Sequence, residues 1–203
     1  YVGVSLDGVD EYHDRFRGQP GSFAQAIAGI RNCRHLGIRV GLRFTLNALN
    51  YDQMPAVLNL MESEDIPRCC VYHLALSGRG ERMKSHILTH EQSRAAVDLI
   101  FEKALDLHQR GLEKDILTVD NHADNVYLYL QLKREEPDRA EDVYQLLRWN
   151  GGNQSGIAIA DIDFNGNVHA DQFSMNYRFG NVKERKFGEI WSDDTPSLLT
   201  KLK

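Results

Sequence analysis

The distribution of apolar residues divides the first 120 residues into short alternating segments and longer segments with helical spacing. Alternation predicts four strands, at 1–6, 38–46, 70–76 and 115–120. Apolar residues at helical spacing predict three helices, at 23–36, 53–62 and 91–110. Because strands and helices follow one another with short connections, we expect parallel strands joined by right-handed crossovers.

The pattern changes near residue 150. A helix predicted at 138–149 ends at Asn150-Gly151-Gly152. Two short segments, 157–163 and 168–173, then flank Asn165-Gly166, a pair typical of a β-hairpin turn. A turn and a short helix are predicted next, at Gly180-Asn181 and 187–191. The expected organisation is therefore a domain with its linker helices at 1–150 and a small α+β module at 151–203.

Each of the four N-terminal strands is predicted to be apolar on one side only. Side chains alternate across a strand, so residue parity assigns them to a face. The polar faces carry, in chain order, Ser5 and Asp7, then Arg43, Thr45 and Asn47, then His73 and Ser77, then Asp120 and His122. This pattern favours a wide or partly open α/β barrel, with helices on the apolar side and a ligand-holding lumen on the polar side. An antiparallel or mixed sheet with one solvated face would alternate in the same way.

Composition narrows the class of protein. Apolar residues make up 42% and charged residues 26% of the chain, which is typical of a soluble globular domain. The net charge of -5 argues against a nucleic-acid or membrane-surface partner, and no apolar segment is long enough to cross a bilayer. Three cysteines cannot build a disulfide framework, which favours a reducing compartment, and the expected location is the cytoplasm.

Several motifs resemble one enzyme superfamily. The stretch Ser5-Leu6-Asp7-Gly8, with His13-Asp14 and Gly21-Ser22-Phe23 after it, is similar to the fourth strand and following loop of radical S-adenosylmethionine (SAM) enzymes. The C-terminal segments GNVHADQF and FGNVKERKFGEIWSD resemble the SPASM-type extension of that superfamily. Together with TVDNHADN and NGGNQSG, they look most like the branch that acts in heme d1 biosynthesis.

The resemblance implies a fold, a cofactor set and a position within a longer protein. The chain would comprise the fourth to sixth strands of a partial (β/α) barrel and part of the SPASM-like module. Such enzymes bind SAM at a [4Fe–4S] cluster held by a Cys-x3-Cys-x2-Cys motif, which is absent from these 203 residues. The cluster ligands are therefore expected outside this chain, which resembles the middle of a protein. A flavodoxin or ferredoxin would be the electron donor.

The resemblance also implies an activity. In the heme d1 branch, a 5′-deoxyadenosyl radical would remove propionate side chains from a decarboxylated siroheme. Two alternatives within the superfamily are a heme synthase that oxidatively decarboxylates propionates and a peptide-modifying maturase. From other classes, a non-catalytic ligand-binding fragment and a metal-dependent hydrolase also remain open, the latter because of an Asp/His string at 120–124.

Site residues follow from the resemblance and from the polar faces. Cofactor contacts are expected from Ser5, Asp7, Arg43, Thr45, Asn47, His73 and Ser77. Arg43 could hold the SAM carboxylate through its guanidinium fork, or it could pair with Asp7 instead. His122 and Asp120 are the candidates for proton transfer during the reaction, since Asp/His pairs serve that chemistry. Substrate contacts are expected from Arg79, Asp124 and His169, and no protein-bound metal ion is expected.

Overall fold

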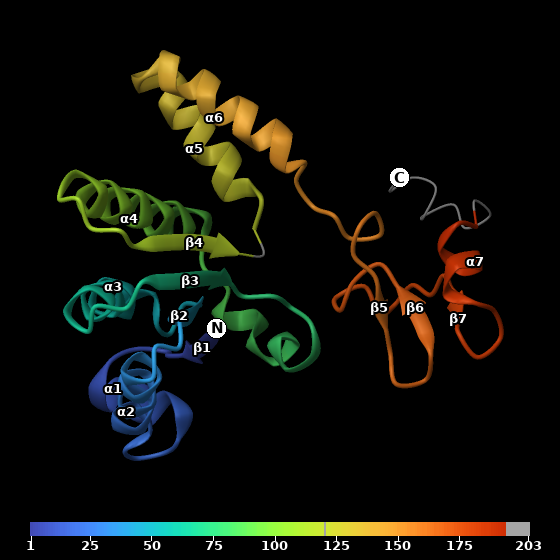
Figure 1. The fold of residues 1–203 in the computed structure, drawn as a ribbon, viewed down its shortest axis with the longest axis horizontal. Helices are drawn as coiled ribbons and strands as arrows, with labels where there is room; N and C mark the ends of the chain where they lie inside the picture. Colours follow the sequence, from blue (N-terminus) through green and yellow to red (C-terminus); the bar gives the residue numbers. More distant parts are fainter. Residues whose placement is uncertain (120, 194–203) are drawn as a thin grey trace. The chain divides into compact units, whose positions relative to one another are not determined.

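The computed structural model describes residues 1–119 and 121–193, and it divides the chain into two compact units, residues 1–124 and 125–203 (Figure 1). Unit 1 contains four strands, which are β1 (Val2–Ser5), β2 (Val40–Leu46), β3 (Arg68–His73) and β4 (Asp115–Val119). Its helices are α1 (Asp10–Arg17), α2 (Ser22–His35), α3 (Met54–Ser63) and α4 (His90–Gln109), with 3-10 turns η1 (Tyr51–Gln53) and η2 (Gly78–His86).

The sheet of unit 1 is parallel throughout, in the order β1-β2-β3-β4. Leu42 lies beside Val4 on one side and beside Cys69 on the other, and Cys69 lies beside Ile116. The expected parallel pairing is therefore confirmed. All four strands consequently end at the same edge of the sheet, which brings their carboxyl ends together.

One face of this sheet carries the hydrophobic core. Leu42, Phe44 and Leu46 are at most 1% exposed, and they pack with residues of α2, α3 and α4. Burying a side chain as large as Phe44 contributes about 1.5–3 kcal/mol to folding by the hydrophobic effect. The helices therefore cover one face and leave the other free to carry polar groups.

The register corrects the predicted faces of two strands. His73 lies beside Leu46, and Tyr72 lies beside Thr45, so Tyr72 and not His73 shares the polar face of β2. In β4, Thr118 lies beside Val71 and thus shares the face of the core. The predicted face of β3 was wrong because the segment Cys69–Tyr72 is apolar on both sides, and that of β4 was wrong because the apolar Leu117 is exposed while the polar Thr118 faces the core. Alternation cannot show which of two apolar sides meets the helices.

Two helices, α1 and α5 (Ala123–Glu135), lie where the apolar pattern predicts none. Helix α1 buries only His13, so it has too few apolar positions to be recognised by periodicity. Asp14 connects it to α2: the carboxylate of Asp14 accepts hydrogen bonds from the backbone of Gly21 and Phe23 and from the Ser22 hydroxyl, at 2.6, 2.8 and 3.0 Å. These bonds fix the loop that follows the carboxyl end of β1.

Unit 2 combines a pair of longer helices with a small antiparallel sheet and a short final helix. Helix α6 (Pro137–Asn150) lies beside α5 (Figure 1), and the rings of Tyr129 and Tyr144 meet with centroids 5.5 Å apart. The sheet has the order β5-β6-β7, with β5 (Asp161–Ile162), β6 (Asn167–His169) and β7 (Gly180–Asn181), and it is followed by α7 (Phe187–Trp191). Its core consists of Val168, Ala170, Phe179 and Ile190.

The expected hairpin between β5 and β6 is confirmed, and Gly166 in its turn has a φ of 89°. Gly180-Asn181 was predicted to be a turn and instead forms β7, which pairs with Asn167 and Val168. The edge pairing with β6 decides the conformation here, and this partner is not visible in the local sequence. Among the described helices, none is long and apolar enough to cross a membrane.

Candidate functional site

Three predicted cofactor residues meet on the face of the sheet opposite the core. Ser5, the last residue of β1, lies beside Arg43 of β2 in the parallel register. Thr45 follows two residues after Arg43 and therefore points to the same side. Ser5 and Arg43 are exposed and Thr45 is half-buried. The structure thus brings a hydroxyl, a guanidinium and a second hydroxyl together near the carboxyl ends of β1 and β2.

Glycines on this face make room for larger side chains. A Cβ atom on Gly3 would collide with the Arg43 side chain, and one on Gly41 would collide with the Tyr1 hydroxyl group. Arg43 therefore lies across β1, and Tyr1 lies across β2. In a strand, glycine often marks a place where another group approaches the backbone closely.

Arg43 carries a charge that the described residues do not neutralise. None of the ion pairs among them includes Arg43. Asp7, its alternative partner, pairs with Arg17 instead, with 2.5 Å between Asp7 Oδ2 and Arg17 Nε. The two atoms are close enough for an ion pair, although Asp7 Oδ2 has no hydrogen-bond partner among the described residues. The guanidinium group of Arg43 is therefore available to an anion.

Asp7 belongs to a local network at the start of α1. Its backbone N–H donates to His13 Nδ1 over 3.1 Å, and His13 is only 3% exposed. Burial lowers the pKa of His13, although the nearby Asp7 carboxylate acts in the opposite direction. The neutral ring that accepts this bond helps to hold the loop after β1. Asp7 thus has structural partners, and its contact with a cofactor stays a prediction.

Asn47 lies in a buried turn after β2. Its side chain donates to the Thr45 carbonyl over 3.2 Å and accepts from the Leu49 backbone over 3.0 Å. Asn50, which is fully buried, accepts from the Asn47 backbone over 3.0 Å and also donates to the Asp7 carbonyl over 3.3 Å. These amides connect the ends of β1 and β2. Asn50 was not among the predicted residues, and only its position shortly after a strand could have indicated it.

A histidine–aspartate pair joins the carboxyl ends of β3 and β4. His73 Nε2 lies 2.8 Å from Asp124 Oδ2, and Asn121 Nδ2 donates to Asp124 Oδ1 over 2.8 Å. Asp124 is 4% exposed and lies in the first turn of α5. His122, the predicted proton-transfer residue, is exposed, and Asp120 lies outside the described residues. His73 and Asp124 were predicted separately, and the structure pairs them.

The loop after β3 carries two further predicted residues. Ser77 is half-buried and precedes η2, where its carbonyl accepts from Gly80 N over 3.0 Å. Arg79 is exposed. The carbonyl of His86, at the end of η2, accepts from Ala48 N over 2.7 Å, which ties this loop to the turn after β2.

His169, the predicted residue of unit 2, belongs to the hairpin of that unit. Its Nδ1 donates to the Tyr177 carbonyl over 2.8 Å, while its Nε2 lies 3.5 Å from Asp163 Oδ2. Asp163 accepts from the side chain of Asn167 and from the backbone of Asn167 and Asn165, and these bonds lower the pKa of Asp163 to about 2. Asp163 and His169 therefore stabilise the turn between β5 and β6.

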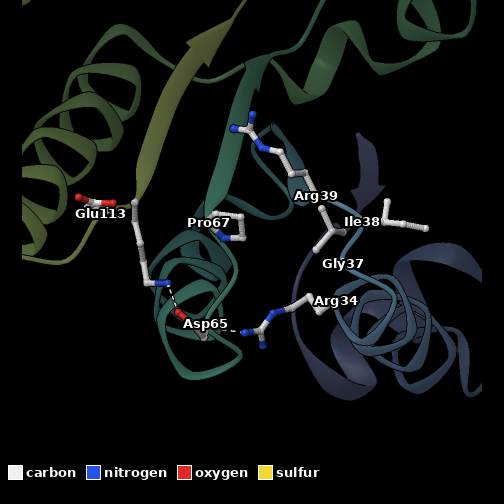
Figure 2. A pocket seen from close by; sticks show the side chains of 9 residues that line it. Arg34, Gly37, Ile38, Arg39, Asp65, Pro67 and Glu113 are labelled. Atoms are coloured by element: carbon white, nitrogen blue, oxygen red, sulfur yellow. Dashed lines mark hydrogen bonds and ion pairs between the residues drawn. The ribbon is translucent and has the colours of Figure 1, made fainter.

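The opposite end of the sheet carries a surface pocket of about 310 Å³ (Figure 2). Its residues precede β2, β3 and β4, so it lies at the amino ends of the strands. Arg34 and Lys114 both reach the Asp65 carboxylate, at 2.6 and 2.9 Å, and the bond from Lys114 lowers the pKa of Asp65. Arg34, Lys114 and Asp65 are thus already paired, and ligands of parallel α/β sheets bind at the carboxyl ends of the strands, so we place the functional site at that edge, where Arg43 has no ion pair among the described residues.

The cysteines are poor ligands in this structure. Cys69 is buried, and burial raises the pKa of its thiol to about 12. Cys70 is the next residue of β3 and points to the other face of the sheet. Cys33 is half-buried in α2. Among the described residues, no group of three or more His, Cys, Asp or Glu side chains is placed to hold a metal ion.

Two related synthases align with essentially the whole chain. The Fe-coproporphyrin III synthase of Methanosarcina barkeri is 52% identical over 203 residues, which are 100% of this chain and 51% of the synthase. The pre-heme d1 synthase of Dinoroseobacter shibae is 39% identical, over 98% of this chain and 50% of that protein. The chain is a homologue of radical SAM tetrapyrrole synthases. It spans about half the length of these relatives.

More distant similarity supports the same conclusion. The AdoMet-dependent heme synthase of Oleidesulfovibrio alaskensis is 24% identical over 93% of this chain. Crystal structures of Streptococcus suis SuiB superpose with TM-scores of 0.66 and 0.67 over 95% of the chain and 42% and 43% of SuiB, at 14% and 15% identity. These structures confirm the expected partial α/β barrel of the radical SAM type. No family model matches the chain.

Proposed function

We propose that the protein modifies the carboxylated side chains of an iron tetrapyrrole by radical SAM chemistry. The observation that carries this proposal is the 52% identity to an Fe-coproporphyrin III synthase along the whole chain. The SuiB structures include one bound to its precursor peptide, but an identity of 14% to SuiB supports a shared fold only. A tetrapyrrole substrate is therefore favoured over a peptide.

SAM fits the residues at the carboxyl ends of β1 and β2. Gly3 lets the Arg43 side chain lie flat on the sheet, and Arg43 has no carboxylate partner among the described residues. Arg43 would bind the carboxylate of SAM through two parallel hydrogen bonds, while Ser5 and Thr45 would bind its hydroxyl or amino groups. SAM would supply the radical that begins the reaction, and these residues would hold it in one orientation.

The iron–sulfur cluster does not fit the cysteines of this chain. Cys69 and Cys70 point to opposite faces of the sheet, and Cys33 lies in α2 on the core side. Cluster ligands would therefore come from residues outside this chain, as in the related enzymes that the sequence resembles. A small redox protein such as a flavodoxin or ferredoxin would then supply electrons to the cluster.

The side chain that is modified distinguishes two forms of the proposal. Removal of propionates from a decarboxylated siroheme would match the pre-heme d1 synthase, which is 39% identical. Formation of Fe-coproporphyrin III would match the synthase that is 52% identical. The higher identity favours the second product, while both reactions use a carboxylated iron tetrapyrrole.

The decisive experiment uses the complete gene product, purified without oxygen and reconstituted with iron and sulfide. It is incubated with SAM, dithionite and didecarboxysiroheme. The tetrapyrroles are then separated by chromatography, and their masses are measured by mass spectrometry. We expect 5′-deoxyadenosine to form together with a lighter tetrapyrrole that coelutes with Fe-coproporphyrin III. Coelution with pre-heme d1 would select the other product.

A matched control is Arg43→Lys, which keeps the charge and removes the guanidinium fork. This variant should require more SAM for half-maximal rate and still form the same product. SAM cleavage by the unchanged protein without any change in tetrapyrrole mass would contradict the proposed substrate.

A further inference from the structure

His73 is half-buried and differs from the buried histidines His13 and His169 in how its ring is bonded. The Nδ1 atoms of His13 and His169 are occupied by backbone groups, the Asp7 amide and the Tyr177 carbonyl. Among the described residues, the ring of His73 has one hydrogen-bond partner, Asp124, which it meets through Nε2. Its side chain is 17% exposed, and Nδ1 is not among the buried polar atoms that lack a partner, so this nitrogen is not enclosed by the described residues.

Asp124 fixes the orientation of this ring. Both of its oxygens are engaged, Oδ2 by His73 Nε2 and Oδ1 by Asn121 Nδ2, each at 2.8 Å. The carboxylate is 5% exposed and lies in the first turn of α5, where the helix dipole favours negative charge. Because a carboxylate oxygen accepts, Nε2 donates to Asp124, and Nδ1 is the ring nitrogen that remains for another molecule.

The pair occupies the edge of the sheet where the other candidate groups lie. His73 is the last residue of β3 and lies beside Leu46 at the end of β2, while Asn121 and Asp124 follow β4. Ser5 and Arg43 lie at the ends of β1 and β2 in the same unit. This edge of the sheet thus carries Arg43, which has no ion pair among the described residues, on the polar face, and the oriented imidazole of His73 at the end of β3, on the side that Leu46 shares.

We propose that His73, oriented by Asp124, binds a carboxylate side chain of the tetrapyrrole through Nδ1–H. The inference rests on the proposed function, because it names the group of the substrate that this ring recognises. The attraction is a charge-assisted hydrogen bond from Nδ1–H to the carboxylate of the ligand, with Nε2 of the same ring held by Asp124. His73 is then a binding residue, and Asp124 is a positioning residue.

The test measures binding by the complete gene product, without turnover. Iron coproporphyrin III and its tetramethyl ester, which lacks the negative charges, are titrated separately into the protein, and the shift of the Soret band is followed. The unchanged protein should bind the acid more tightly than the ester. His73→Gln should weaken binding of the acid about tenfold, as expected for the loss of one hydrogen bond to a charged group, and should leave the ester unchanged.

Asp124→Asn provides the second variant. It retains a side chain of the same shape and removes the carboxylate that orients the His73 ring, so it should reduce the acid-to-ester preference in the same direction as His73→Gln. His90→Gln removes an exposed imidazole at the start of α4 and serves as the control with unchanged preference. Circular dichroism of each variant shows whether it folds.

The outcomes separate this inference from the proposed function. If the unchanged protein binds neither the acid nor the ester, the proposed substrate class is wrong, and the role of His73 with it. If it prefers the acid and both folded variants keep that preference, the role of His73 is wrong while the proposed function stands. If a variant weakens binding of the acid and of the ester equally, the residue that it changes has only a structural role.

Discussion

The two units of the molecule differ in how much apolar surface they bury. Unit 1 encloses a continuous core between a four-stranded parallel sheet and α2, α3 and α4. Among the described residues of unit 2, the core cluster around the small sheet has four buried members, and large side chains such as Trp149 and Phe164 are 87% and 95% exposed. Stability follows buried apolar area, so unit 1 should be a rigid scaffold and unit 2 a weaker one.

The two units are held in their folded structures by different kinds of interaction. Unit 1 is ordered by packing, and its polar residues at the strand ends can be left for binding. Unit 2 is ordered to a larger extent by polar turns, such as the amides around Asp163. Both tryptophans, Trp149 and Trp191, belong to unit 2, so tryptophan fluorescence reports on that unit while circular dichroism at 222 nm reports on helices in both.

The largest effect is expected from Phe44→Ala in the core of unit 1. Phe44 is fully buried, and removing a buried aromatic ring lowers the free energy of unfolding by about 3–5 kcal/mol. Urea denaturation followed by circular dichroism should show this loss. Phe164→Ala, at a 95% exposed position, is the control and should change stability by less than about 0.5 kcal/mol. Equal effects of the two changes would show that the core has been wrongly placed.

A smaller effect is expected from Ile190→Ala in unit 2. Ile190 is fully buried against Phe179 and Gly180, but its core cluster is small, so the site can partly collapse. We expect a loss of about 2 kcal/mol, near the lower limit for such changes. Tryptophan fluorescence should detect it at lower urea than the main circular dichroism transition. A single transition, shifted equally for both probes, would contradict the independence of the units.

Gly3→Ala should affect binding more than stability. The added methyl group displaces the Arg43 side chain, which can swing toward solvent, so the free energy of unfolding should fall by no more than about 1 kcal/mol. The affinity for SAM, measured by equilibrium dialysis, should fall in parallel with that of Arg43→Ala. Gly29→Ala, on α2 with open space around it, is the control. Unchanged SAM affinity in Gly3→Ala would separate Arg43 from the cofactor.

The smallest effect is a pH dependence confined to unit 2. The pKa of Asp163 is lowered to about 2, so the unfolded chain binds a proton at this residue more readily than the folded one. The stabilisation is complete above the ordinary pKa near 4 and is lost as the pH falls toward 2. Asp163→Asn should remove this part of the pH dependence in fluorescence-detected unfolding. A wild-type and variant pair with parallel profiles between pH 4 and 2 would contradict it.

Some of this structure is visible in the sequence, and some is not. The alternation of Leu42, Phe44 and Leu46 predicts both the strand and its buried face, because one side is apolar and the other is polar. Cys69–Tyr72 has no such contrast, and its faces were therefore assigned wrongly. Helix α1 escapes prediction because only His13 of its residues is buried.

The same contrast holds for the candidate site. Ser5, Arg43 and Thr45 were predicted to share a face, and the register confirms it. The contact between His73 and Asp124 joins residues 51 positions apart, and no local pattern specifies such a pairing. Likewise, the choice of Arg17 over Arg43 as the partner of Asp7 depends on the path of the loop after β1.

The absence of a side chain at Gly3 has a consequence for the entropy of binding. A long arginine side chain on an open surface samples many rotamers, and fixing them in a complex costs up to about 2 kcal/mol. The space above Gly3 admits one of these rotamers, in which Arg43 lies across β1. An anion that binds the guanidinium there meets the cost of fixing the side chain but no further cost of moving the strand beneath it, so more of the interaction energy remains as affinity.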